Sequence, residues 1–121
     1  MTARIVPILN ASDIAATKEF YCDVLGAEIM SEYRDDEGAD PVYCSLSLMG
    51  PELHFTTTLG QGGKGIPIYV YYDDVDGIGA KVQAARPDAV RIAPVDQTWG
   101  MRECYIEDPD GNVLRFGHPI A

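Results

Sequence analysis

The chain has 121 residues, a formal net charge of −10 and 46% hydrophobic residues, which suits a single ordinary domain with its own hydrophobic core. Its 19 acidic residues outnumber 9 basic ones, so phosphate groups would repel it, and we expect neither nucleic acid nor a membrane as a partner. No apolar run approaches the roughly 20 residues that span a bilayer, and the first residues lack a signal-peptide pattern. The sequence therefore predicts a cytoplasmic protein, with its three cysteines reduced because they lack disulfide or zinc-site spacing.

The first half of the chain predicts one strand, one helix and three further strands. The first strand covers residues 4–9, and Pro7 within it favours a sheet edge, because proline cannot donate to a strand ladder. The helix begins at Ser12 or Asp13, which can cap it, and ends at Gly26. The three strands that follow are predicted at residues 27–33, 42–49 and 52–58.

A glycine-rich segment at residues 59–65 predicts a flexible linker between two similar halves. Beyond it, a strand at residues 68–72 leads into a helix that starts at Asp73 or Asp74 and is closed by Pro87. Three more strands are predicted at residues 90–95, 99–107 and 113–117.

The two halves repeat one pattern, and His54 and Arg115 occupy equivalent places in it. We therefore predict an α+β protein of two βαβββ modules, at about residues 1–58 and 66–121, within one domain that covers residues 1–121. The modules are expected to form a curved mixed sheet around a cleft that lies between them.

Two motifs carry a resemblance to a known family. Residues 13–26, DIAATKEFYCDVLG, are similar to the helix of the vicinal oxygen chelate superfamily, which includes glyoxalases, bleomycin resistance proteins and dioxygenases. Residues 99–103, together with DPDGNVLRF at residues 108–116, resemble the C-terminal hairpin of its bleomycin-resistance-like branch. The resemblance implies a homodimer whose clefts lie between modules and near the partner chain.

The resemblance also locates the positions at which metal-dependent members carry His or Glu ligands. These positions are Val6, His54, Pro67 and Arg115 in this sequence. His54 alone can ligate a metal, whereas catalytic sites commonly use three protein ligands, and the guanidinium of Arg115 would repel a cation. We therefore predict no metal and no other cofactor.

Ligand-binding residues are predicted from strand alternation, which places Trp99, Met101, Glu103 and Tyr105 on one face. The resemblance assigns this face to the cleft. Aromatic rings beside a carboxylate suit a flat, partly cationic aromatic guest, although the same residues could be ordinary half-buried strand residues and the acids could serve solubility. The full predicted set is Trp99, Glu103, Tyr105, Met101, His54, Arg115, Phe55 and Tyr33.

The function implied by the resemblance is non-catalytic binding and sequestration of an antibiotic-type small molecule, bleomycin-like molecules included. The alternative is a glyoxalase-like or dioxygenase-like lyase or isomerase that acts on a small metabolite, with His54 as acid/base or metal ligand. No Ser-His-Asp or Cys-His arrangement can be recognised in the sequence, so no catalytic residue is predicted.

Overall fold

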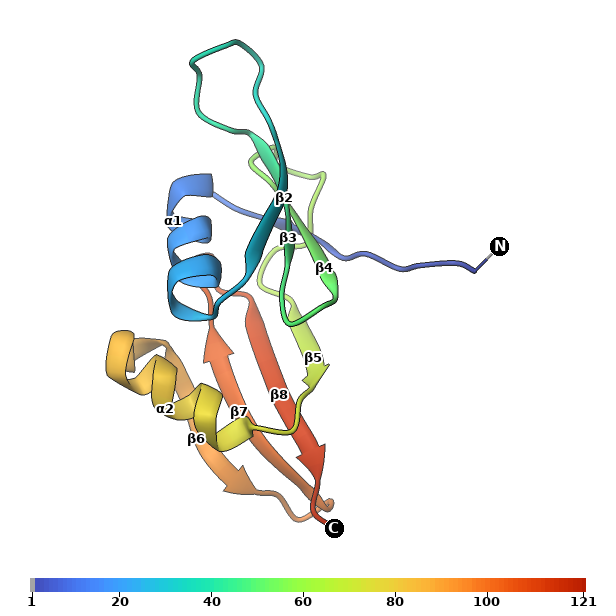
Figure 1. Cartoon of the computed structure of the whole chain (residues 1–121), viewed down its shortest axis with the longest axis vertical. Helices are drawn as coiled ribbons and strands as arrows, with labels where there is room; N and C mark the ends of the chain where they lie inside the picture. The colour runs from blue at the N-terminus through green and yellow to red at the C-terminus, as the bar shows by residue number, and fades with distance from the viewer. Residues whose placement is uncertain (1) are drawn as a thin grey trace. The chain divides into compact units, whose positions relative to one another are not determined.

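Two units make up the chain, which we describe from a computed structural model that covers residues 2–121. One unit extends to Lys64 and the other begins at Gly65. Each unit has the βαβββ element order that the internal repeat predicts (Figure 1). Within residues 2–121, hydrogen bonds join the strands into two four-stranded sheets, one in each unit. The fold class is therefore confirmed, with a separate mixed sheet in each module.

The first sheet has the strand order β1-β4-β3-β2, in which β1 and β4 are parallel and the other pairs are antiparallel. β1 is an edge strand, as Pro7 predicts, but it is shorter than expected and begins after the proline. The carbonyl of Pro7 accepts a hydrogen bond from the backbone N–H of His54 in β4. The strands are β1 (Ile8–Asn10), β2 (Glu28–Tyr33), β3 (Tyr43–Ser47) and β4 (Glu52–Thr56).

The helix of the first unit starts as the sequence predicts and then widens. Asp13 caps α1 (Ile14–Lys18) by accepting a hydrogen bond from the N–H of Ala15. The chain continues without a break into the π-helix η1 (Glu19–Val24). Gly26 follows with φ of 79°, the left-handed conformation that glycine adopts without a steric penalty.

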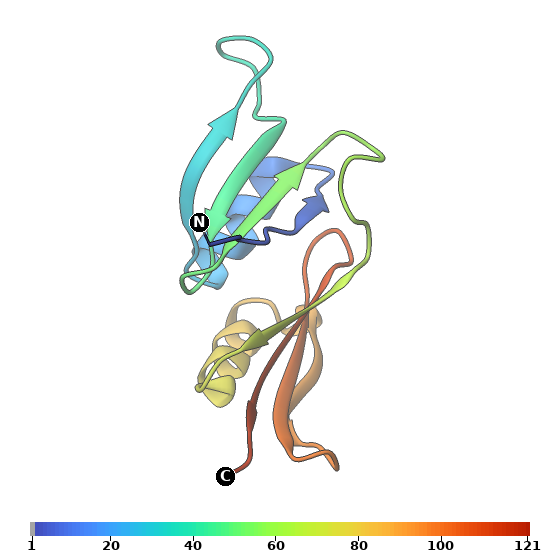
Figure 2. The same cartoon turned by 90° about the vertical axis from the view of Figure 1, so that its right-hand side faces the viewer.

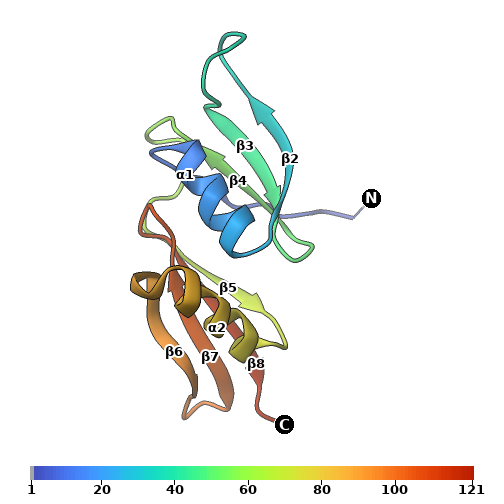
Figure 3. The same ribbon diagram turned by 60° about the vertical axis from the view of Figure 1, so that its left-hand side comes forward.

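The core of the first unit lies between this helical segment and one face of the first sheet (Figure 3). Tyr21 packs against Phe55 of β4, with ring centroids 4.8 Å apart. The buried apolar residues of the unit are Leu9, Ala11, Ile14, Phe20, Tyr21, Val24, Leu25, Ala27, Cys44, Leu46, Leu48, Leu53 and Phe55.

The segment predicted as a linker contains no helix or strand, but it is fixed to β1. The N–H of Gly63 donates to the carbonyl of Ile8, and the N–H of Asn10 donates to the carbonyl of Gly63. A Cβ on Gly62 would lie 2.8 Å from the carbonyl carbon of Leu9, so the close approach requires a glycine. The glycines here allow tight backbone contact as well as turns.

The second sheet repeats the topology of the first, with the order β5-β8-β7-β6 and a parallel pair, β5 and β8 (Figure 2). Asp74 caps α2 (Val75–Ala85), and the short 3₁₀ helix η2 (Pro87–Ala89) follows. The strands are β5 (Pro67–Tyr71), β6 (Val90–Asp96), β7 (Met101–Glu107) and β8 (Val113–Pro119). No helix within residues 2–121 is both long enough and apolar enough to cross a membrane.

Candidate functional site

The second sheet has one face against α2 and an opposite face that we call the open face. Cys104 and Ile106 of β7 point toward α2 and are fully buried. Alternation therefore turns Glu103 and Tyr105 to the open face, as the sequence predicts. The strand register then places Arg115 of β8 directly between Tyr69 of β5 and Tyr105. Two phenols, one carboxylate and one guanidinium thus meet at the centre of the open face.

Glu103 is the buried centre of this group, with 1% of its surface exposed. The hydroxyl of Tyr69 donates to its Oε2 at 2.7 Å, and the hydroxyl of Tyr105 donates to its Oε1 at 3.0 Å. Nη2 of Arg115 lies 3.7 Å from the same Oε1. Both carboxylate oxygens therefore already have partners within the sheet, which offsets the cost of burying the charge.

Burial raises the pKa of Glu103, but the opposing influences prevail and leave this pKa below its ordinary value. They are hydrogen bonds from the side chains of Tyr69, Tyr105 and Trp99, together with the charge of Arg115. Burial and the bond to Glu103 raise the pKa of Tyr69 to about 12. The same two causes raise the pKa of Tyr105, against the effect of Arg115. At neutral pH the carboxylate is therefore ionised and both phenols keep their protons.

Arg115 is more accessible than Glu103, with 35% of its side chain exposed. Its Nη2 donates to the hydroxyl oxygen of Tyr105 at 2.6 Å, and its Cζ lies 4.5 Å from the centroid of the Tyr105 ring. Its Nε is buried and has no hydrogen-bond partner among residues 2–121. The phenol and the carboxylate thus hold the guanidinium in place while part of it faces outward.

Gly117 of β8 creates the space that this arrangement needs. A Cβ at this position would lie 1.9 Å from the hydroxyl oxygen of Tyr69 and 3.2 Å from Cγ of Glu103. Because the first of these distances is far below van der Waals contact, a side chain here would displace the Tyr69 hydroxyl from Glu103. Gly117 and Tyr69 are not among the predicted site residues, because neither follows from alternation within β7.

Trp99 does not lie in a strand, contrary to the prediction. Gly100, with φ of 85°, forms the turn between β6 and β7, so β7 begins only at Met101. Trp99 is 59% exposed in that turn, although its side chain still contributes a hydrogen bond to Glu103. Met101 lies at the start of β7 and is half-buried.

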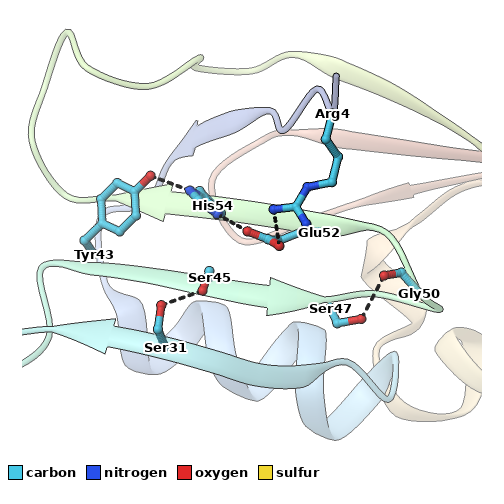
Figure 4. A network of polar contacts seen from close by, with 8 residues as sticks. All are labelled: Arg4, Ser31, Tyr43, Ser45, Ser47, Gly50, Glu52 and His54. Atoms are coloured by element: carbon cyan, nitrogen blue, oxygen red, sulfur yellow. Dashed lines mark hydrogen bonds and ion pairs between the residues drawn. The ribbon is translucent and has the colours of Figure 1, made fainter. Parts of the chain in front are cut away.

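The first unit holds a second polar group, centred on His54 of β4 (Figure 4). Nδ1 of His54 lies 2.6 Å from the hydroxyl of Tyr43, and its Nε2 lies 2.5 Å from Oε2 of Glu52. Arg4 donates to the other oxygen of Glu52 at 3.1 Å. The hydrogen bond with His54, and to a lesser extent Arg4, lowers the pKa of Glu52 below its ordinary value. An ionised carboxylate only accepts, so neutral His54 carries its proton on Nε2, and Nδ1 accepts from Tyr43.

Tyr43 connects this group to a hollow of about 470 Å³ within the first unit. Tyr33, which is 61% exposed at the end of β2, also lines the hollow together with Thr56 and Gln61. Burial raises the pKa of Tyr43, so its hydroxyl is protonated at neutral pH and donates its hydrogen to Nδ1 of His54. The arrangement can accept or deliver a proton at the wall of a small cavity.

Phe55 does not belong with the predicted binding residues. It is 1% exposed and packs in the core of the first unit, on the face of β4 opposite His54. Alternation along β4 is the physical reason, because residues 52, 54 and 56 share one face and residue 55 turns to the other. Phe55 therefore stabilises the module, and its side chain does not reach the surface.

The positions that the resemblance equates with metal ligands do not form a ligand set here. The residues opposite His54 and Arg115 on the neighbouring parallel strands are Ile8 and Tyr69. Both ring nitrogens of His54 already have hydrogen-bond partners. Within residues 2–121, no group of three or more His, Cys, Asp or Glu side chains is arranged to hold a metal ion.

Comparison with solved structures shows the same fold over nearly the entire chain. A glyoxalase-related enzyme from Clostridium phytofermentans has a TM-score of 0.81 and 23% identity, with 99% of this chain and 97% of that chain covered. TnmS3, an antibiotic binding protein from Streptomyces sp. CB03234, has a TM-score of 0.77 and 21% identity, with coverage of 98% and 97%. A bleomycin-binding protein complexed with bleomycin has a TM-score of 0.71 and 23% identity, with coverage of 97% and 98%.

The sequence itself shows the family. A search of curated protein sequences finds no significant match. A profile described as the Glyoxalase/Bleomycin resistance protein/Dioxygenase superfamily matches residues 3–116, which is almost the entire length of the chain. The protein therefore belongs to the glyoxalase/bleomycin resistance protein/dioxygenase superfamily.

Proposed function

We propose that this protein binds and sequesters an antibiotic-type small molecule with an aromatic ring system, without transforming it. The observation that carries the proposal is the ordered group of Tyr69, Glu103, Tyr105 and Arg115 on the open face. Its side chains already hold one another in place, so a ligand would bind with little cost of ordering them. The relatives described as antibiotic-binding and bleomycin-binding proteins support this class of function.

Trp99 provides the test of this proposal, because it is the sole tryptophan and lies beside Glu103. Titration with bleomycin and with a panel of planar aromatic antibiotics should change its fluorescence in a saturable way. By calorimetry, Trp99→Ala should weaken binding by about 1–3 kcal/mol, the cost of losing a stacking surface. Leu59→Ala, which truncates a side chain that is 78% exposed in the first unit, is the control and should leave binding unchanged. Absence of saturable binding across the panel would overturn the proposal.

Catalysis is the second candidate, and the hydrogen-bonded series Glu52–His54–Tyr43 favours it. In this case a small metabolite bound in the hollow would exchange a proton with His54 through the hydroxyl of Tyr43, in a lyase or isomerase reaction. Mass spectrometry of each bound compound after prolonged incubation separates the two candidates. Chemical change that is lost in both His54→Gln and Tyr43→Phe would favour the enzyme, whereas unchanged ligand with intact binding favours sequestration.

The proposal includes a homodimer, as the family resemblance implies. Exposed apolar side chains on the second sheet, such as Ile92 and Val95, offer area that a second copy could cover. Light scattering coupled to size-exclusion chromatography should give twice the mass of 13.2 kDa. A monomer at micromolar concentration would remove the dimer from the proposal and leave the ligand-binding part in place.

A further inference from the structure

The carboxylate of Glu103 is expected from the sequence to select a cationic ligand, but its surroundings in the fold argue against that role. It is 1% exposed, and each of its oxygens accepts a hydrogen bond from a tyrosine. A cationic group could reach it only by displacing Tyr69 or Tyr105 and by losing its own hydration in a buried place. Glu103 therefore acts within the sheet, where it fixes the two phenols and faces Arg115.

The next acid on the same face of β7 is also paired. Glu107 forms an ion pair with Arg91 at 2.8 Å. The two carboxylates that β7 turns to the open face thus each have an arginine beside them, Arg115 in one case and Arg91 in the other. The net negative charge of the whole chain consequently does not carry over to the centre of the open face.

The polar hydrogens still available at the centre of this face belong to Arg115. The hydroxyl hydrogens of Tyr69 and Tyr105 are already donated to Glu103, so these phenols can offer a ligand only their oxygen lone pairs and their rings. Of the five N–H bonds of Arg115, one donates to Tyr105 and the one on Nε is buried, so the remaining bonds on the two Nη atoms are the ones that a ligand can reach on this 35% exposed side chain. A ligand that binds here must therefore supply an acceptor to a fixed cation.

Aromatic rings surround that cation. The Cζ of Arg115 lies 4.5 Å from the centroid of Tyr105 and 5.8 Å from that of Tyr69, whose ring in turn lies 4.9 Å from the ring of Tyr71. Tyr71 is 76% exposed, so its ring is accessible to a flat guest. We propose that the open face of the second sheet recognises an aromatic ring system that carries an anionic oxygen, a carboxylate or an ionised phenol, bonded to Arg115. This inference rests on the proposed binding function and names its ligand class.

Three probes with one ring system and different charges test the inference. Isothermal titration calorimetry with 2-naphthoate, 2-naphthalenemethanol and 2-naphthylmethylammonium compares anion, neutral molecule and cation on the same protein. We expect 2-naphthoate to bind about tenfold or more tightly than the other two, because a charge-assisted hydrogen bond favours it. Preference for the ammonium probe, or equal affinity for all three, would overturn the inference and leave the binding function standing. If none of the three binds, the proposed binding function fails for this face as well.

Variants of Arg115 and Glu103 should change the affinity for 2-naphthoate in opposite directions. Arg115→Gln should weaken 2-naphthoate by about tenfold or more, and Glu103→Gln should strengthen it, because the competing negative charge is removed. If Glu103 were the recognition group, Glu103→Gln would instead abolish binding of the ammonium probe. Arg102→Gln is the matched control, since it also removes one positive charge but lies on the α2 side, paired with Asp76 and Asp96. The thermal transition of each variant identifies loss of fold, and the wild-type probe series decides the question if a variant does not fold.

Discussion

Replacement of Gly117 by alanine is a sharp test of the open-face arrangement, because two physical effects predict opposite signs. Gly117 lies within β8 and is not among the residues with positive φ, so alanine fits its backbone. In that setting Gly→Ala usually stabilises a protein by about 0.4–1 kcal/mol, through the entropy of the unfolded chain. The added Cβ would, however, lie 1.9 Å from the Tyr69 hydroxyl oxygen and force it away from Glu103.

The magnitude follows from the bond that is lost. A hydrogen bond to a buried charged group contributes about 1.5–3 kcal/mol, so after subtracting the entropic gain Gly117→Ala should lower the free energy of unfolding by about 0.5–2.5 kcal/mol. Urea denaturation followed by far-UV circular dichroism measures this value. Tyr69→Phe removes the same bond, so the double variant should cost less than the sum of the two single variants. A Gly117→Ala protein as stable as the wild type would refute the reasoning.

A pH series adds a second check on the same pair. In the folded protein the pKa of Glu103 lies below its ordinary value of 4.5. The ionised carboxylate therefore stabilises the fold fully above pH 4.5, and this stabilisation is lost as the pH falls through the folded pKa. The destabilisation by Gly117→Ala should therefore be largest at neutral pH and smaller in acid. An effect that does not change between pH 7 and pH 3 would indicate simple steric strain without loss of the charged bond.

Three further predictions concern parts of the chain outside the open face. Gly62→Ala should lower the unfolding free energy by about 1–3 kcal/mol, since its Cβ would clash with the backbone of β1; stability equal to the wild type in urea would contradict this. Asp13→Ala should cost about 1 kcal/mol in the same assay through loss of the α1 cap, and Asp13→Asn should restore most of it. At pH 8 a thiol reagent should label partly exposed Cys22 first, because burial raises the pKa of Cys44 and Cys104 to about 11; rapid labelling of all three in the folded protein would contradict the structure.

Local physical rules, applied to the sequence, were sufficient for the architecture. The repeated apolar spacing indicated two βαβββ modules, Pro7 indicated an edge strand, and Gly26 indicated the end of a helix. The structure confirms each of these predictions. Alternation also placed Glu103 and Tyr105 on one face correctly. These features depend on neighbours a few residues away, so a pattern along the chain is enough to predict them.

Sequence reasoning was wrong about the strand that holds Trp99 and about the exposure of Phe55. Trp99 fits the alternation of β7, but Gly100 adopts a left-handed conformation in the preceding turn, so the strand begins only at Met101. Phe55 lies next to His54 in sequence, but it faces the opposite side of β4 and belongs to the core. The first case depends on where a turn closes, and the second on which face of β4 is covered by the helix.

The electrostatic character of the open face was decided by tertiary structure alone. Alternation fixes the face of a residue but not its opposite residue in the next strand, so it could not place Arg115 between Tyr69 and Tyr105. Nor could it show that Gly117 leaves room for a phenol that takes up a carboxylate oxygen. Strand register depends on contacts between segments far apart in the chain, and it turns Glu103 from an apparent ligand for cations into a buried partner of Arg115.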